Sequence, residues 1–217
     1  NLDKMGIGSN INNIKDLEGN GRYRFVKEDL LDFTLISSLV KEVDAVINPA
    51  AETHVDRSIA NPRTFLENNT IGTFNLLEAA RVNNPRLRII QVSTDEVYSD
   101  ISIGSYREED RLKPSNPYSA SKAAADMFCL AYHRTYNLDI IITRCTNNFG
   151  PYQFPEKLIP KTIIRASLGM KVPIYGRNIR DWIYVLDHCD ALDLILREGR
   201  SGETYNISAG AKWTTSH

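Results

Sequence analysis

The sequence lacks several features that identify whole classes of protein. No apolar run approaches the roughly 18 residues of a membrane-spanning helix, so we expect no contact with a membrane. The cysteines are few, namely Cys129, Cys145 and Cys189, and they are widely spaced and odd in number. Such cysteines are typical of reduced thiols in the core of a cytoplasmic protein, not of disulfides. The histidines have no metal-ligand spacing with them, so no metal is predicted.

Neither sign of charge dominates the sequence. The 26 lysines and arginines nearly balance the 27 aspartates and glutamates, and the basic residues are scattered along the chain. A nucleic-acid-binding surface needs a concentration of basic residues, so nucleic acid is not a predicted partner. A chain of 217 residues can bury one good hydrophobic core or two small ones.

One strand carries the clearest chemical pattern. Residues 87–93 form a short apolar run, which is typical of a buried parallel strand. Thr94, Asp95 and Glu96 follow at its carboxyl end, where open α/β sheets place their ligands. Asp-Glu after a strand also often begins a helix or lies in a solvated loop. Further strands are predicted at 22–27, 44–48, 139–144 and 202–208, and further helices at 33–42 and 62–83.

A second pattern lies in the next helix. Residues 118–136 have helical periodicity, which places Tyr118 and Lys122 on the same face, one turn apart. An ammonium beside a phenol favours the phenolate and lowers the pKa of the tyrosine. Tyr118 is therefore a candidate general base near neutral pH. A Tyr-x-x-x-Lys pair alone is common by chance, so the argument rests on its combination with the strand end.

A strand ending in Ser-Thr, followed by a helix that carries Tyr-x-x-x-Lys, resembles the short-chain dehydrogenase/reductase superfamily. Three longer strings are similar to the dTDP-glucose 4,6-dehydratase family in particular. They are Val-Ser-Thr-Asp-Glu-Val-Tyr at 92–98, Pro-Tyr-Ser-Ala-Ser-Lys-Ala-Ala at 117–124 and Asn-Asn-Phe-Gly-Pro-Tyr-Gln-Phe-Pro at 147–155. The resemblance extends over nearly the whole chain.

The resemblance implies an α/β fold, with a Rossmann-like doubly wound parallel sheet and a smaller α+β substrate domain. We expect an NAD-binding domain at 1–146 and a nucleotide-sugar-binding region at 147–217, truncated at its carboxyl end. Neither Gly-x-x-Gly-x-x-Gly nor Gly-x-Gly-x-x-Gly occurs in the sequence. The first βαβ unit, which carries this phosphate loop, is therefore expected to be missing from the chain. The resemblance also implies a homodimer formed through helix 117–136.

The same resemblance implies NAD as the cofactor. Asp3 matches the acidic residue that dinucleotide folds place on the adenosine ribose. Asp29 is expected at the adenine amino group, although it could equally cap the amino end of the helix at 33–42. The predicted cofactor-binding residues are Asp3, Lys4, Asp29, Leu30, Ala50, Ala51, Glu52, Thr53, Tyr118, Lys122 and Asn148.

The implied substrate is dTDP-glucose. Asn147 is expected at the diphosphate, and Arg180 beside it, because a guanidinium fork matches phosphate oxygens. A structural ion pair is the alternative for Arg180. The predicted substrate-binding residues are Thr53, Thr94, Asn147, Lys157, Leu158, Pro173, Ile174, Tyr175 and Arg180.

The family reaction oxidises C4 of the sugar so that the C5 hydrogen becomes acidic and water can leave. The resemblance gives Tyr118 the C4 hydroxyl proton and Glu96 the C5 proton, and has protonated Asp95 donate to the leaving C6 hydroxyl. Thr94 is expected to donate a hydrogen bond to the C4 oxygen, and Lys122 to assist the tyrosine and bind the nicotinamide ribose. The expected product is a 4-keto-6-deoxy sugar, which belongs to deoxysugar synthesis of the rhamnose type.

Three alternatives stay open. A nucleotide-sugar 4-epimerase would share Thr94, Tyr118 and Lys122 but has no need of Asp95 and Glu96. A dehydratase for another nucleoside diphosphate sugar would keep both carboxylates and differ in the base pocket. A non-catalytic dinucleotide-fold binding protein would be favoured by a true absence of the glycine-rich loop.

Overall fold

The computed structural model describes residues 1–101, 103–172, 179–210 and 212–214. The chain divides into two compact units. The larger unit comprises Asp29–Cys145 and Ala191–Ile207, and the smaller unit comprises Asn1–Glu28, Thr146–Asp190 and Ser208–His217.

A parallel sheet of four strands forms the centre of the larger unit. The strands are β1 (Ala45–Asn48), β2 (Arg88–Thr94), β3 (Ile140–Cys145) and β6 (Thr204–Ile207), and they lie in the order β1-β2-β3-β6. All neighbouring pairs are parallel. The doubly wound parallel sheet expected from the sequence is confirmed. β6 belongs to this sheet, so the units do not follow the single predicted boundary between 146 and 147.

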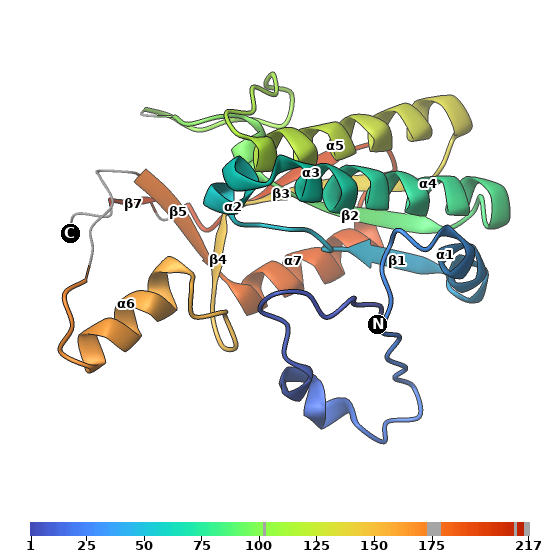
Figure 1. Cartoon of the computed structure of the whole chain (residues 1–217). Coiled ribbons are helices and arrows are strands. Elements are labelled where there is room, and N and C mark those ends of the chain that lie inside the picture. Colours follow the sequence, from blue (N-terminus) through green and yellow to red (C-terminus); the bar gives the residue numbers. More distant parts are fainter. Residues whose placement is uncertain (102, 173–178, 211, 215–217) are drawn as a thin grey trace. The chain divides into compact units, whose positions relative to one another are not determined.

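Helices cover the sheet of the larger unit. They are α1 (Phe33–Leu39), η2 (Val40–Glu42), α2 (Val55–Ala60), α3 (Pro62–Phe65), η3 (Leu66–Ile71), α4 (Gly72–Asn83), η4 (Asp95–Val97) and α5 (Pro117–Tyr136). Figure 1 shows α3, α4 and α5 along one face of the strands, where α5 contacts both β2 and β3. Residues 191–198, the end of α7 (Val185–Glu198), cover the opposite face.

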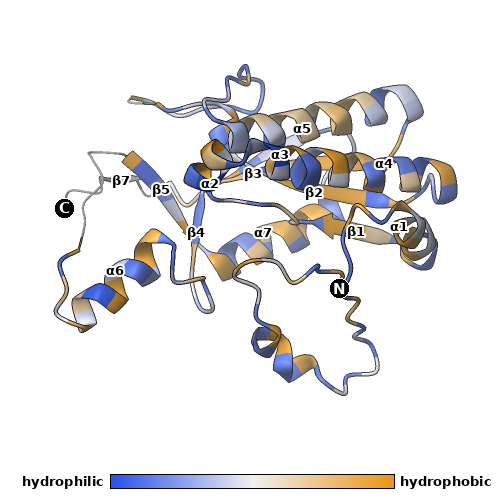
Figure 2. Ribbon diagram, viewed as in Figure 1, coloured by the Kyte–Doolittle hydropathy of each residue, from blue (hydrophilic) through white to orange (hydrophobic). Residues whose placement is uncertain are grey.

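The core lies between these layers. Ile89 and Ile90 of β2 are fully buried, and so are their register partners in β3, Ile140 and Ile141. Figure 2 shows hydrophobic residues running along β2. A strand buried on both faces reads as a continuous apolar run, and this is why residues 87–93 predicted β2 correctly.

Helix α5 begins and ends at strong sequence signals. Asn116 accepts a hydrogen bond from the backbone of Ser119, whose hydroxyl in turn accepts one from the backbone of Asn116. This capping box satisfies backbone donors that a helix start otherwise leaves unpaired. Pro117 occupies the first helical position, which proline favours. Asn137 ends the helix in the left-handed conformation, with φ of 57°.

Two sequence predictions differ from the structure. The helix expected at 62–83 is present, but its middle, Leu66–Ile71, is a wider π-helical turn between α3 and α4. The strand expected at 22–27 is wrong, because Val26 forms only an isolated bridge with Leu2. A strand needs a ladder that continues along its partner, and here the hydrogen bonds end with Asn1 and Asp3.

The smaller unit has its own three-stranded sheet, in the order β4-β5-β7. β4 (Asn147–Phe149) is parallel to β5 (Ile179–Tyr184), and β7 (Lys212–Thr214) is antiparallel to β5. The helical elements are η1 (Ile11–Leu17), α6 (Leu158–Ser167) and the beginning of α7. This combination is the expected α+β architecture.

Candidate active site

Thr94 organises the carboxyl end of β2. Its hydroxyl accepts a hydrogen bond from the backbone N–H of Glu96 at 3.2 Å and donates one to Asp95 Oδ1, also at 3.2 Å. Thr94 is thereby the N-cap of η4, and Asp95 and Glu96 form its first turn. The interpretation of Asp-Glu as the beginning of a helix is therefore confirmed for η4. It also holds both carboxylates, half-buried, at the strand end.

Tyr118 lies in the first turn of α5 and is almost completely buried. Its ring packs edge-on against Phe65 of α3, with 6.2 Å between the ring centroids. Burial raises the pKa of Tyr118, and the negative charge of Glu96 raises it further, while a hydrogen bond with Thr94 opposes the shift. The larger unit thus brings together Tyr118, Thr94 and Glu96, as the sequence predicted.

The expected effect of Lys122 on the pKa of Tyr118 is not seen in the structure. We expected its ammonium to lower the pKa of Tyr118, but in this structure the pKa of Tyr118 is raised. Lys122 is buried, and its Nζ donates to the backbone carbonyl of Val92 in β2 at 2.6 Å. The ammonium is directed at the strand, so loss of solvation dominates the titration of the phenol. The pKa of Lys122 is itself lowered by burial, against the attraction of Asp126.

Asn69 is a positioning residue that the sequence patterns did not reveal. It lies fully buried in η3, where its Oδ1 accepts from the backbone N–H of Glu52 at 2.8 Å. Its Nδ2 donates to the backbone carbonyl of Glu52 at 3.0 Å and to the hydroxyl of Ser121 at 2.9 Å. Asn69 therefore ties the loop after β1 to the residue that precedes Lys122. An asparagine pair inside an amphipathic helix was the only available signal.

The other predicted cofactor residues of the larger unit lie near loop and helix starts. Asp29 does not cap α1, because that cap is Asp32, whose carboxylate accepts from Leu35 N at 2.9 Å. Asp29 instead accepts from Leu31 N at 3.1 Å. Leu30 packs against Gly72 of α4. In the loop after β1, Ala50 and Thr53 are exposed, whereas Ala51 and Glu52 are half-buried.

The smaller unit contains the remaining predicted site residues. Asp3 Oδ1 accepts from Met5 N at 2.6 Å, and Lys4 is half-buried. Asn147 donates to the carbonyl of Asp181 at 3.3 Å. Asn148 donates to the carbonyl of Thr146 at 3.2 Å, and its Oδ1 lies 2.9 Å from Nδ1 of His188. Lys157 and Leu158 stand at the start of α6, and Arg180 is half-buried in β5. Pro173, Ile174 and Tyr175 lie outside the described residues.

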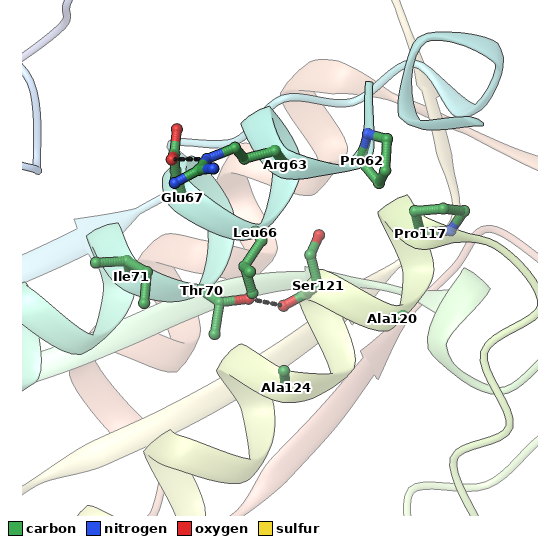
Figure 3. A pocket seen from close by; sticks show the side chains of 10 residues that line it. All are labelled: Pro62, Arg63, Leu66, Glu67, Thr70, Ile71, Pro117, Ala120, Ser121 and Ala124. Atoms are coloured by element: carbon green, nitrogen blue, oxygen red, sulfur yellow. Dashed lines mark hydrogen bonds and ion pairs between the residues drawn. The ribbon is translucent and has the colours of Figure 1, made fainter. Parts of the chain in front are cut away.

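An apolar groove crosses the helical face of the larger unit (Figure 3). Figure 3 shows Leu66 and Thr70 on one side facing Ser121 and Ala124 of α5 on the other. The hydroxyl of Thr70 bridges the two sides by donating to the Ser121 carbonyl at 3.0 Å. Leu66 is more than half exposed, so this helical face presents apolar surface to solvent.

Two classes of site find no support among the described residues. No helix in those ranges combines the length and the apolar character that crossing a membrane requires. In the same ranges, no group of three or more His, Cys, Asp or Glu side chains is placed to hold a metal ion.

Comparisons with known proteins agree with this arrangement. The family model described as GDP-mannose 4,6 dehydratase matches residues 2–217. A dTDP-glucose 4,6-dehydratase of Actinoplanes sp. is 47% identical over 211 residues, which cover 96% of this chain and 66% of that protein. The chain therefore spans slightly less than two thirds of the length of that relative.

Solved structures show the same fold. A dTDP-glucose 4,6-dehydratase from Streptomyces venezuelae, solved with NAD bound, superimposes with a TM-score of 0.95 at 45% identity, covering 99% of this chain and 67% of that one. A UDP-glucuronic acid 4-epimerase from Bacillus cereus, solved with UDP-glucuronic acid and NAD, gives a TM-score of 0.92 at 28% identity. The matched region covers 99% of this chain and 70% of the epimerase.

Proposed function

This chain belongs to the GDP-mannose 4,6-dehydratase family, and on that premise we propose that the whole protein is an NAD-dependent hydro-lyase. Its substrate is dTDP-glucose and its product is dTDP-4-keto-6-deoxyglucose. The 47% identity to a dTDP-glucose 4,6-dehydratase supports dTDP-glucose over the GDP sugar in the family description.

One observation carries the proposal. The Thr94 cap holds Asp95 and Glu96 at the end of β2, and Glu96 is close enough to Tyr118 to raise its pKa. A dehydration at C5 and C6 needs a base and an acid in addition to the group that deprotonates the C4 hydroxyl. Adjacent carboxylates beside a buried phenol provide such a set, provided that their environments push their pKa values apart.

The residues at the strand ends fit the nicotinamide half of NAD. Ala50 and Ala51 follow β1 with small side chains, so a ligand can approach the backbone there. Lys122 can donate to a ribose hydroxyl, because an ammonium has three donors and the Val92 carbonyl uses one. When bound, NAD supplies the hydride acceptor and donor of the reaction. The sequence contains no glycine-rich loop for its pyrophosphate.

The proton transfers are assigned to three residues of this chain. Tyr118 takes the proton of the C4 hydroxyl, and Thr94 donates a hydrogen bond to the C4 oxygen once its hydroxyl hydrogen turns from Asp95 to the substrate. Glu96 removes the C5 proton, and Asp95 protonates the departing C6 hydroxyl. Burial and Glu96 raise the pKa of Tyr118, so we assign Lys122 the task of favouring the phenolate when substrate and NAD are bound.

The resemblance also assigns the substrate and cofactor contacts. We assign the diphosphate to Asn147 and Arg180, and the sugar to Thr53 and Thr94. The thymidine pocket is assigned to Lys157, Leu158, Pro173, Ile174 and Tyr175, and the adenosine part of NAD to Asp3, Lys4, Asp29 and Leu30. Glu52 is assigned with Ala50 and Ala51 to the nicotinamide-ribose side of NAD, and Asn148 to the cofactor. These assignments rest on the family resemblance.

The test is a product analysis with the whole protein. It is incubated with NAD and, in separate reactions, dTDP-glucose, GDP-mannose and UDP-glucuronic acid, and the sugars are analysed by NMR and mass spectrometry. We expect loss of one water from dTDP-glucose and a 4-keto-6-deoxy sugar. Recovery of a 4-epimer without water loss would favour the epimerase alternative, which the similarity to the Bacillus cereus epimerase raises. No reaction with any sugar would overturn the proposed activity.

We assign a second copy of the chain as partner and the cytoplasm as location. Several apolar side chains of η3 and α5 are exposed in the larger unit, namely Leu66, Ile71, Met127 and Phe128. A contiguous apolar helical face commonly marks an interface. Light scattering should give the mass of a dimer, and Leu66→Glu with Met127→Glu should give a monomer. The free thiols Cys129, Cys145 and Cys189 are consistent with a reducing compartment.

A further inference from the structure

A fully buried ion pair lies in the larger unit beside the proposed active site. Asp126 of α5 and Arg144 of β3 are 0% and 3% exposed at their side chains, and Arg144 Nε lies 3.0 Å from Asp126 Oδ2. Removing two charges from water is costly, and a buried ion pair is often no more stable than well-packed apolar residues would be. The proposed reaction assigns neither residue a task, so the pair requires another explanation.

Asp126 is a neighbour of the proposed catalytic lysine. It follows Lys122 by four positions in α5, which places the two side chains on one face of the helix. Both side chains are buried, and the carboxylate of Asp126 stabilises the charged form of Lys122 against the loss of solvation. Burial raises the pKa of Asp126, and Arg144 and Lys122 both oppose this rise by stabilising its carboxylate form.

The other groups that face Lys122 do not replace this carboxylate. From α5 itself, Cys129 is neutral, because burial raises the pKa of its thiol. From β3, Cys145 donates its thiol hydrogen to the carbonyl of Ser93 at 3.4 Å. From β2, the Val92 carbonyl contributes a dipole. The carboxylates of η4, Asp95 and Glu96, act on Tyr118.

Arg144 is held on several sides, so it can fix the position of Asp126. Its Nη1 donates to the hydroxyl of Tyr98 at 2.7 Å and to the backbone carbonyl of Glu108 at 3.2 Å. Its guanidinium also lies over the Tyr98 ring, 4.9 Å from the centroid. Tyr98 in turn donates to Asn206 of β6 at 2.8 Å. Arg144 therefore has little freedom to move away from Asp126.

We propose that Asp126 and Arg144 are positioning residues of the active site, in which the Asp126 carboxylate keeps Lys122 charged and Arg144 fixes that carboxylate. The proposal rests on the proposed function for the role of Lys122. A positioning role differs from a purely structural one in a measurable way, because the pH midpoint of Lys122 then depends on the charge at position 126.

The same sheet offers a matched control. Arg88 Nε and Asp139 Oδ2 are joined at 2.8 Å, and Arg88 also donates to the carbonyl of Leu196 at 3.0 Å. This second pair links the beginning of β2 to the residue before β3, at the opposite end of the strands from Thr94. Asp139→Asn removes the same chemical group from an Arg–Asp ion pair, one that is partly exposed and lies at the other end of the strands.

The experiment follows the Lys122 side chain by NMR in protein labelled with 13C at lysine Cε, assigned with Lys122→Met. Asp126→Asn should lower the pH midpoint of Lys122 by about 1 unit or more, because a nearby opposite charge shifts a pKa by roughly 1–3 units. Asp139→Asn should leave the midpoint unchanged. An unchanged midpoint in folded Asp126→Asn protein would overturn the proposal.

A double variant covers the case in which Asp126→Asn does not fold. Asp126→Asn with Arg144→Gln removes both charges together and keeps hydrogen-bonding groups at both positions. The Lys122 midpoint should again fall by about 1 unit or more, and a wild-type midpoint in this protein would equally overturn the proposal.

Turnover provides an independent readout. If the wild-type protein dehydrates dTDP-glucose, the alkaline limb of its pH–rate profile should move to lower pH in Asp126→Asn and stay in place in Asp139→Asn. A uniform loss of rate at every pH, with the Lys122 midpoint unchanged, would assign the pair a purely structural role. A wild-type protein without dehydratase activity would contradict the proposed function alone, because the NMR titration does not depend on turnover.

Discussion

Asn69 and Glu52 are joined by two hydrogen bonds, so that one side chain satisfies both backbone groups of a loop residue. The amide of Asn69 accepts from Glu52 N at 2.8 Å and donates to Glu52 O at 3.0 Å, in the way that a neighbouring strand would. The loop after β1 therefore keeps its conformation without belonging to the sheet.

Replacement of this amide should destabilise the protein. We expect Asn69→Leu to lower the free energy of unfolding by at least about 2 kcal/mol, because each buried polar group left unpaired costs about 1–3 kcal/mol. Urea unfolding measures the change. Asn68→Leu is the matched control, since the half-buried Asn68 amide donates to Thr64 O within the same helix. Equal losses in the two variants would contradict a special role of Asn69.

Loss of the Tyr118 hydroxyl should abolish turnover. Tyr118→Phe is expected to reduce kcat by at least about 10²- to 10⁴-fold, the usual contribution of a general base, with substrate affinity nearly unchanged. Steady-state kinetics and calorimetric titration with dTDP-glucose measure the two quantities. Tyr132→Phe is the control, because it removes another buried hydroxyl from α5. Turnover like that of the wild type in Tyr118→Phe would remove Tyr118 from the mechanism.

The two carboxylates of η4, Glu96 and Asp95, should have different effects on exchange of the C5 hydrogen with solvent. Glu96→Gln is expected to lose exchange of the C5 hydrogen with solvent deuterium and to form no dehydrated product. Asp95→Asn should keep the exchange and slow only the loss of the C6 hydroxyl, because its acid acts after C5 is deprotonated. NMR in deuterium oxide reports both events. Rapid C5 exchange in Glu96→Gln would assign the base to another residue.

Tyr132 should make the stability of the protein depend on pH in the alkaline range. Burial, with the hydrogen bond to Glu78, raises the pKa of Tyr132 to about 12, compared with about 10 in an unfolded chain. The unfolded state therefore loses this proton first as the pH rises. The contribution of Tyr132 is complete below about pH 10 and declines until about pH 12.

The prediction is tested by urea unfolding of the wild type and Tyr132→Phe between pH 9 and pH 12. The difference in unfolding free energy between the two proteins should be constant up to about pH 10 and then shrink. A difference that stays constant to pH 12 would show that the Tyr132 proton is not bound more tightly in the folded state.

The chain of 217 residues is expected to bind NAD weakly by itself. The backbone amides that receive a pyrophosphate at a helix N-terminus belong to a glycine-rich loop that this sequence does not contain. Isothermal titration calorimetry of the chain with NAD should give little or no heat. Tight, stoichiometric binding would mean that other residues build the phosphate site.

The sequence was sufficient to predict those elements whose signals are local. The apolar run at 87–93 predicts β2, and the helical periodicity of 118–136 predicts α5, because the burial pattern of an element depends on neighbours along the chain. The order of Thr94, Tyr118 and Lys122 predicts that phenol and strand end meet, and Tyr118 does interact with Thr94.

Long-range contacts could not be predicted in the same way. The direction of Lys122 depends on the distance from α5 to the Val92 carbonyl, 30 positions away in the sequence. The bond from Asn69 to Ser121 spans 52 positions, and the pairing that would make a strand of 22–27 depends on which chain lies beside it. Such facts arise from the packing of elements, so a residue pattern alone does not contain them.

The π-helical turn at Leu66–Ile71 has a consequence for how this segment tolerates a change in length. A π-turn holds more residues than an α-turn, so this segment accommodates an extra residue that a regular α-helix would not. Phe65 and Leu77 are twelve positions apart, which would place them about 120° apart around an uninterrupted α-helix, yet both lie in the core. With one residue deleted from the π-turn, an uninterrupted α-helix would place them about 20° apart, so both would still face inward. The segment should therefore tolerate the loss of one residue better than the gain of one.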